Sequence, residues 1–410
     1  MSPTLALIGA LDTKAEDYAF LKSAVEAGGC AALLIDFSVA AEPGLKPDIA
    51  ASEVAEAGGN SLATLRAAGD RGAAMLAMAE GAAVLTRRLF DDGLIHGVIG
   101  MGGSGATTVA TAAMRALPFG VPKVMVSTLA SGDVGRFVGT SDITMIHSVV
   151  DISGINRLSR ILYTRAAGAA CGMALTRIPP GGDKPLIAAT MFGNTTRAVT
   201  RAKALLEPAG FEVLVFHATG TGGRTMESLI ESGLITGVLD MTTTEWADEL
   251  CDGVLSAGPT RLEAASRLGV PQIVVPGCLD MCNFWGRDTV PERYADRTFF
   301  QWADNVTLMR TTAVETAQLG EIFAEKLNAA TGPVEVYIPL RGWSEIDVQG
   351  KPFYLPGAIA AFSQALKAHL RSDIPVHELD TDINDPGFAD ATARALLTLQ
   401  EAVPHGDSTL

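Results

Sequence analysis

Residues 97–108 read Gly-Val-Ile-Gly-Met-Gly-Gly-Ser-Gly-Ala-Thr-Thr, and residues 120–126 read Gly-Val-Pro-Lys-Val-Met-Val. The first stretch predicts a short apolar strand that ends at Ile99. The glycines after it let the chain turn and expose backbone N–H groups. We expect an alanine-rich helix to open at Thr107 and Thr108 and to stop before Pro118. A strand, a glycine turn and a helix N-terminus together form an anion site, most simply for a phosphate group.

Length and composition limit the class of protein. A chain of 410 residues, of which 48% are hydrophobic, is long for one core, so we expect two domains. A net charge of -15 argues against nucleic acid and against an anionic membrane as partners. No apolar run is long enough to span a bilayer, and no signal peptide precedes the first strand.

Five cysteines are scattered along the chain, which favours a reduced, cytoplasmic protein. Cys278 and Cys282 are close in sequence, but no histidine stands beside them. A zinc site there is therefore disfavoured.

The first half alternates between strand and helix patterns. Apolar strands are expected at residues 5–8, 30–36, 97–99, 121–126 and 143–150, and helices at residues 15–27, 61–92 and 156–170. Thr13 and Glu16 have the spacing of a capping box for the first helix. Residues 173–176 are expected to close the domain, and the Pro- and Gly-rich residues 179–183 mark a boundary.

The second half repeats the first. Residues 233–242 mirror residues 93–102, and residues 269–276 mirror residues 120–127. We therefore predict an α/β fold of two doubly wound, Rossmann-like domains, residues 1–182 and 183–410, whose parallel sheets face a shared cleft. The strands of the second domain are expected at residues 186–190, 211–216, 334–340 and 375–379, besides the two mirrored segments.

Ligands of open parallel sheets bind beyond the carboxyl ends of the strands, where hydroxyls, glycines and one lysine gather in this chain. In the first domain the expected cofactor-binding positions are Asp12, Thr13, Lys14, Asp36, Gly102, Gly103, Ser104, Gly105, Thr107, Thr108, Ser127, Thr128, Ser131, Gly132 and Asp133. In the second domain the expected substrate-binding positions are Asn194, Thr195, Thr196, His217, Thr219, Gly222, Thr243, Glu245 and Arg341.

The glycine stretch allows other interpretations. It formally fits a dinucleotide motif, but the next strand ends in Ser127 and Thr128, where a ribose-binding carboxylate would be needed. Ser104 resembles a nucleophile elbow whose histidine would be His96, His147 or His217. The glycines could also serve only to pack helix against sheet.

Polar groups of the second domain are equally open to interpretation. Asp240, Glu245, Asp248 and His217 could bind a divalent metal. We favour the alternative that Glu245 and Asp248 lie in the first turn of a helix, where the dipole favours acids. Arg341 could hold a carboxylate or phosphate, or form a surface salt bridge.

Several motifs together resemble the Tm-one-like ATP-binding family, which is related to the N-terminal domain of a plant tobamovirus-resistance protein. They are Gly-Ala-Leu-Asp-Thr-Lys at residues 9–14, Gly-Met-Gly-Gly-Ser-Gly-Ala-Thr at 100–107, Lys-Val-Met-Val-Ser-Thr-Leu-Ala-Ser-Gly-Asp at 123–133, Pro-Gly-Cys-Leu-Asp-Met at 276–281 and Pro-Leu-Arg-Gly-Trp-Ser at 339–344. The resemblance covers nearly the whole chain. It implies two Rossmann-like subdomains, ATP and Mg²⁺ held mainly by the first, and a homodimer.

We therefore expect a cytoplasmic ATP-binding protein that acts on a small molecule in the interdomain cleft. The glycine loop would hold the phosphates, Lys14 would neutralise them, and Asp12 or Asp133 would hold Mg²⁺ directly or through water. Two alternatives stay open. One is a nucleotide-independent hydrolase or lyase of a small carboxylic acid, and the other is a non-catalytic ligand sensor.

Overall fold

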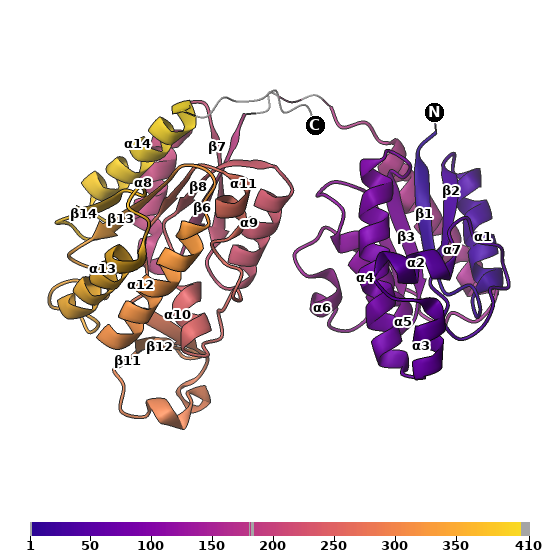
Figure 1. Cartoon of the computed structure of the whole chain (residues 1–410), viewed down its shortest axis with the longest axis horizontal. Coiled ribbons are helices and arrows are strands. Elements are labelled where there is room, and N and C mark those ends of the chain that lie inside the picture. Colours follow the sequence, from indigo (N-terminus) through magenta and orange to yellow (C-terminus); the bar gives the residue numbers. More distant parts are fainter. Residues whose placement is uncertain (1, 180, 182–183, 403–410) are drawn as a thin grey trace. The chain divides into compact units, whose positions relative to one another are not determined.

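The computed structural model describes residues 2–179, 181 and 184–402. The chain divides into two compact units, Met1–Pro180 and Gly181–Leu410. Each unit has its own sheet and its own hydrophobic core (Figure 1).

The first unit is built on a five-stranded sheet in which every pair of neighbours is parallel. In order across the sheet, the strands are β2 (Ala31–Asp36), β1 (Thr4–Gly9), β3 (Gly97–Gly102), β4 (Lys123–Ser127) and β5 (Thr144–His147). The order reverses between β1 and β3. This is the switch point at which doubly wound sheets bind ligands.

Helices cover both faces of this sheet, as Figure 1 shows. Leu5 and Leu7 of β1 pack toward α1 (Ala15–Ala27) and α7 (Arg157–Leu175). Ala6 and Ile8 point the other way, into a cluster with α2 (Ala51–Ala57), α3 (Leu62–Ala68), α4 (Arg71–Asp91) and α5 (Ser104–Arg115). A short helix, α6 (Gly135–Val138), follows β4. Both faces of the strand are apolar because both are buried.

The second unit repeats this plan with one more strand. The order is β14 (Val376–Leu379), β13 (Val334–Pro339), β9 (Gln272–Val274), β8 (Ile235–Asp240), β6 (Leu186–Met191) and β7 (Glu212–His217), all parallel. Strands β3 and β8 occupy the same place in their sheets, as do β4 and β9. The internal repeat in the sequence therefore corresponds to a repeat of topology, and the prediction of two Rossmann-like α/β domains is confirmed. The shared cleft stays a prediction.

Two groups of helices enclose the second sheet. One face packs on α8 (Thr196–Leu206) and α14 (Pro386–Ala402). The other packs on α9 (Thr221–Glu231), α11 (Ala264–Leu268), α12 (Ala313–Asn328) and α13 (Pro356–His369). The short helix α10 (Glu245–Leu250) follows β8, and single 3₁₀ turns lie at Gly193–Thr195, Arg287–Thr289 and Glu292–Tyr294.

A third sheet was not predicted. β10 (Met281–Phe284), β12 (Val306–Arg310) and β11 (Phe299–Ala303) form a small antiparallel sheet between β9 and α12. Its inner side chains pack on Cys278 and Phe353, which belong to loops at the carboxyl edge of the large sheet.

Several local expectations are wrong. Helix α5 begins at Ser104, three residues before Thr107, and Gly100 lies inside β3. A Cβ at Gly100 would come within 2.5 Å of the Ala110 Cβ, so this glycine packs strand against helix. Helix α7 runs past the expected end at residue 170 and continues to Leu175.

The expected capping box at the first helix is also absent. The residue that caps α1 is Lys14, and no side chain accepts a hydrogen bond from the first turn.

Candidate functional site

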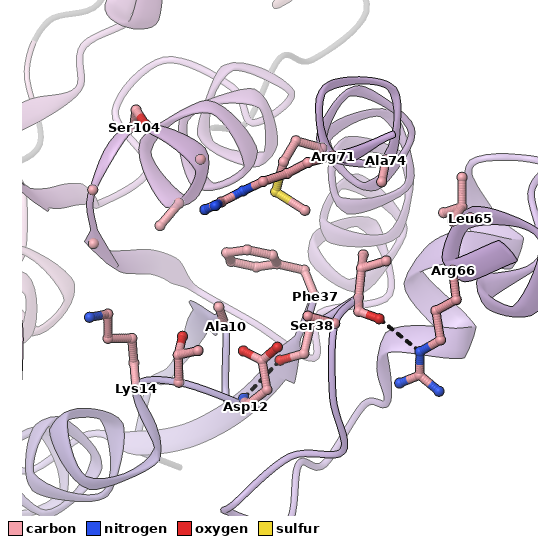
Figure 2. Close-up of a pocket in the computed structure, with 18 of the residues that line it drawn as sticks. Ala10, Asp12, Lys14, Phe37, Ser38, Leu65, Arg66, Arg71, Ala74 and Ser104 are labelled. Carbon is pink, nitrogen blue, oxygen red and sulfur yellow. Dashed lines mark hydrogen bonds between the residues drawn. The ribbon is translucent and has the colours of Figure 1, made fainter. Parts of the chain in front are cut away.

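A cavity of about 680 Å³ lies at the switch point of the first sheet. Its walls come from the segments that follow β1, β2 and β3 and from the start of α4 (Figure 2). Of the predicted positions, Asp12, Thr13, Lys14, Gly102, Gly103, Ser104 and Gly105 line it. The structure therefore brings together residues that are about ninety positions apart in the sequence.

Asp36 does not line the cavity but holds two of its walls. The side chain is buried, and its Oδ1 accepts hydrogen bonds from Leu11 N at 3.1 Å and from Ser38 N at 3.0 Å. The Ser38 hydroxyl, bound to the same oxygen, also accepts from Asp12 N at 2.9 Å. The loops after β1 and β2 are thus tied to one carboxylate, which fixes where Asp12 lies.

The glycine loop presents the N-terminus of α5 to the cavity. Gly103 is the N-cap residue, no side chain caps the helix, and no acidic residue occurs in its first turn. Within the described residues, the N–H groups of Ser104, Gly105 and Ala106 donate no hydrogen bond to the protein. A Cβ at Gly102 would lie 2.3 Å from the Ala106 Cβ, so only glycine lets the helix start so close to β3. The positive end of the helix dipole is left uncompensated there.

Three hydroxyl residues predicted as ligands lie behind this loop. Thr107 donates to Gly103 O at 2.8 Å, and its hydroxyl is 2.7 Å from the Ser127 Oγ. Thr108 donates to Ser104 O at 3.0 Å. The contact between Thr107 and Ser127 holds the start of the helix against the end of β4.

Basic side chains meet the glycine loop from two directions. Lys14 lines the cavity, and its ammonium group donates one hydrogen bond to Ile152 O. The Arg71 guanidinium extends from the start of α4 toward the loop, as Figure 2 shows. No hydrogen bond or ion pair of Arg71 is found in the described part of the chain. Arg66 also lines the cavity but is engaged by Val39 O at 2.8 Å.

Carboxylates complete the lining. Asp12 and Asp151 both border the cavity, and Asp70 borders it while accepting a hydrogen bond from Ala73 N at 3.0 Å. Asp133 is not part of this lining. Its Oδ1 accepts from Gly135 N at 2.8 Å, in an exposed turn. Thr128, Ser131 and Gly132 likewise lie outside the cavity.

Sequence reasoning missed Phe37, Leu65, Met75, Arg71 and Asp151. The first three give the cavity an apolar wall. The one signal that the sequence carried was Arg71, an arginine directly after the helix-capping Asp70, where the dipole disfavours a cation.

The acidic cluster predicted in the second unit binds an arginine. Arg261 is fully buried, and its guanidinium contacts Asp240 Oδ2 at 2.6 Å and Glu245 Oε2 at 2.8 Å, with Glu227 Oε1 at 3.3 Å. Burial by itself lowers the pKa of Arg261, but the carboxylates outweigh it and the pKa rises. Glu245 also accepts from Gly220 N and Gly223 N. The suggestion of a divalent metal here is therefore wrong, because a cation already occupies the carboxylates.

Most other positions predicted for substrate are engaged within the protein. Asn194, Thr195 and Thr243 are buried. Thr196 donates to Gly193 O at 3.1 Å, and Thr219 donates to His217 O at 3.2 Å. A Cβ at Gly222 would come within 1.9 Å of His217 O. His217 itself is exposed, and its ring lies 5.4 Å from that of Phe192.

Arg341 pairs with Asp380, with its Nε 2.7 Å from the Asp380 Oδ1, and both side chains are exposed. This is the surface salt bridge that the sequence left as an alternative.

No histidine contacts Ser104 in the described chain, and His96 accepts a hydrogen bond from Thr4 N at 3.1 Å. The nucleophile-elbow interpretation therefore gains no partner. All five cysteines are free and buried, and the described residues hold no group of three metal-ligating side chains.

Two family models match the chain. The N-terminal and C-terminal domain models of the uncharacterised protein family UPF0261 match residues 3–179 and 184–400. The chain belongs to the UPF0261 family. A UPF0261 protein of Clostridium tetani is 50% identical over 403 residues, which are 98% of this chain and 100% of that one.

The plant relative expected from the sequence motifs is also similar. The tomato (Solanum lycopersicum) ToMV resistance protein Tm-1(GCR237) is 38% identical over 343 residues. The match covers 82% of this chain but 46% of the tomato protein.

Likeness to solved structures is distant. A UDP-N-acetylglucosamine 2-epimerase matches with a TM-score of 0.25 and 11% identity, over 67% of this chain and 79% of that one. A likeness this weak says nothing about function. Among the helices of the described residues, none has the length and apolar character needed to cross a membrane.

Proposed function

We propose that this protein binds ATP with Mg²⁺ in the cavity at the switch point of its first sheet, and uses it to act on a small molecule. The observation that supports the proposal is the cluster of positive charge around α5. An uncapped helix N-terminus, Lys14 and Arg71 all meet one cavity, and none has an acidic partner among the described residues. Asp12, Asp70 and Asp151 line the same cavity, so the positive groups act locally, at the glycine loop, where a phosphate group would compensate the helix dipole and pair with the two basic side chains.

The rest of the lining suits the other parts of the ligand. The free N–H groups of Ser104, Gly105 and Ala106 would hold phosphate oxygens, with Lys14 and Arg71 neutralising them. Phe37, Leu65 and Met75 offer an apolar surface of the kind on which a nucleobase packs. A cavity of about 680 Å³ is large enough for a nucleotide.

The carboxylates could bring a metal to the phosphates. Mg²⁺ binds through one or two carboxylates together with substrate phosphates, so it needs no cage made of protein alone. Asp12 borders the cavity, and Asp151 is a second carboxylate that the sequence did not suggest. Asp133, outside the lining, is not part of the proposal. The cytoplasmic location and the homodimer remain predictions from the sequence.

Calorimetry with Mg-ATP tests the proposal on the full chain. Removing one charge-assisted hydrogen bond costs roughly 1.5–3 kcal/mol, so Lys14→Ala and Arg71→Gln should each weaken binding about tenfold or more. Arg88→Gln is the matched control, because Arg88 is an exposed arginine at the other end of the same helix α4. Lys46→Ala, in an exposed loop, serves the same purpose for Lys14. No heat from Mg-ATP at millimolar concentration, or equal affinities in all four variants, would contradict the proposal.

A further inference from the structure

A second hollow, of about 340 Å³, lies at the carboxyl edge of the second sheet. It is formed by the loops that follow β13 and β14 and by the start of α8, which follows β6. Its lining is Arg197, Glu345, Val348, Lys351, Asp382 and Asn384. Arg341 and the other substrate positions predicted from the sequence are not part of it.

The two basic side chains of this hollow have little else to bind. Arg197 lies in the first turn of α8 with its side chain 70% exposed, and its one ionic contact is with Glu345 at 3.4 Å. Lys351 is exposed and has no hydrogen bond or ion pair from its ammonium group within the described residues. Helix α8 has no acidic residue in its first turn and no side-chain cap at Thr195. The dipole disfavours a cation in that turn, and Glu345 compensates it at present, so a ligand carboxylate would have to share or displace Glu345 at Arg197.

Acceptor groups stand beside these cations. Asp382 uses Oδ1 to accept from Asn384 N at 2.9 Å, which leaves Oδ2 without a partner in the described chain. Asn384 is held by both of its amide atoms, since Oδ1 accepts from Ala198 N at 3.2 Å and Nδ2 donates to Asn194 O at 2.8 Å. The lining of the hollow therefore holds donors for a carboxylate, Arg197 and Lys351, and an acceptor for a hydroxyl group, Asp382, beside the Glu345 carboxylate.

The loop after β13 is rigid, which a preformed site needs. Ser344 donates to the buried Asp280 at 2.7 Å, and the buried Arg310 donates to Asp347 at 3.2 Å. Trp343 N donates to the other oxygen of Asp347 at 3.1 Å. These inward contacts leave the two lining residues of the same loop, Glu345 and Val348, turned to the hollow.

The loops after β13 and β14 are also tied to each other. Arg341 N donates to Thr381 O at 2.9 Å, and Ile383 N donates to Gly342 O at 3.0 Å. Both sides of the hollow are thus fixed by backbone hydrogen bonds before any ligand arrives.

We propose that this hollow binds a small hydroxy acid. Its carboxylate would contact Arg197 and Lys351, and its hydroxyl would donate to Asp382. The inference concerns the second unit alone and is independent of the proposal that the first binds ATP.

Calorimetry on the full chain without nucleotide tests it, with sodium L-malate as the probe and sodium succinate, which lacks the hydroxyl, as the comparison. We expect saturable binding of malate, several-fold tighter than that of succinate because one hydrogen bond is lost. Arg197→Gln and Lys351→Gln should each weaken malate binding about tenfold. Arg201→Gln, on the same helix but paired with Asp390, should leave it unchanged.

Both test residues are exposed, so the variants should fold, and circular dichroism checks this. Absence of malate binding at about 10 mM would overturn the proposed site, and so would equal malate affinity in the Arg197 and Arg201 variants. Equal affinity for malate and succinate would overturn the role of Asp382. Inorganic phosphate that binds more tightly than malate would overturn the assignment to an organic acid.

Discussion

Arg261 is the residue that decides how the acidic cluster of the second unit is to be understood. From the sequence, Asp240, Glu245 and Asp248 allow a metal site, although Glu245 and Asp248 fit the first turn of a helix better. The arginine that neutralises two of them lies some twenty positions away from the first, with no motif to link it. Ion pairs between distant segments depend on the tertiary fold, so this partner could not be read from local spacing.

We predict that Arg261→Met destabilises the second unit by roughly 3–5 kcal/mol, because it leaves buried carboxylates without a counter-charge. Arg267→Met is the control, since Arg267 pairs with Glu231 at the surface with both side chains more than half exposed. A surface pair contributes about 0–1 kcal/mol. Urea unfolding followed by tryptophan fluorescence measures both, because all four tryptophans lie in this unit. If Arg261→Met lowers the free energy of unfolding no more than the surface variant does, the buried network is not needed for stability.

Asp248 gives a prediction about pH. Burial raises its pKa to about 7, although Asn283 and the N–H of Leu255 donate hydrogen bonds to it. Between about pH 4 and pH 7 the folded state therefore holds a proton that the unfolded state releases. The stability that this carboxyl contributes is present at low pH and is lost as the pH rises through this range. Each tenfold difference in proton affinity between the folded and unfolded states corresponds to about 1.4 kcal/mol.

We expect Asp248→Asn to reduce the loss of stability that accompanies this rise in pH. Once the Asn283 amide turns over, the new amide can donate to Asn283 Oδ1, a buried oxygen that has no hydrogen-bond partner among the residues that the structure describes. Urea unfolding at pH 5 and pH 8 measures the effect, with Asp304→Asn in an exposed loop as the control. An unchanged difference between the two pH values in the Asp248 variant would assign the pH dependence to another group.

Among elements, α5 shows how far a sequence pattern reaches. The position of the glycine-rich stretch, between a buried strand and a helix at the carboxyl end of the sheet, was predicted correctly, but Gly100 belongs to the strand itself. The first residue of the helix was not, because the glycines at 102 and 103 allow the helix to start directly after β3. The small antiparallel sheet was missed for another reason. Its edge strand β11 is largely exposed and has no alternating pattern, and it interrupts a chain that otherwise alternates strand and helix.

Gly103→Val separates binding from folding at this element. A Cβ at Gly103 would meet nothing closer than Thr128 Oγ1 at 3.8 Å, so the folded protein has room for a side chain. That side chain would stand over the N–H groups proposed to hold phosphate. We expect Mg-ATP affinity to fall tenfold or more, while stability falls by no more than about 1 kcal/mol.

Gly132→Val is the matched control, because Gly132 belongs to a loop that the sequence also suggested but that lies outside the cavity. Calorimetry and thermal unfolding of both variants give the comparison. If the Gly132 variant loses ATP and the Gly103 variant does not, the phosphate site must be drawn at the loop after β4.

At the scale of the whole molecule, the sequence carried the architecture better than the sites. The repeat of residues 93–102 at 233–242 predicted two sheets of the same design, because buried parallel strands need the same apolar runs wherever they occur. The sites depend on side chains that only folding brings together. Arg71 and Asp151 line the first cavity but lie far from the glycine stretch in the sequence. Lys351 and Asn384 line the second hollow together with Arg197, which lies more than 150 positions earlier in the sequence.

The two units have separate cores, and this leads to a prediction for the whole chain. Clusters of buried residues lie within residues 5–171 in one unit and within residues 187–399 in the other. We therefore expect two unfolding transitions, of which Mg-ATP moves only the first. At a ligand concentration one hundred times the dissociation constant, the stabilisation is roughly 2.7 kcal/mol.

Circular dichroism follows both transitions, while tryptophan fluorescence follows the second alone, since residues 1–180 contain no tryptophan. If Mg-ATP shifts the fluorescence transition as much as the circular dichroism, then the units unfold together or the nucleotide binds elsewhere. Lys14→Ala distinguishes these outcomes, because it abolishes the shift only if the nucleotide binds at the first cavity.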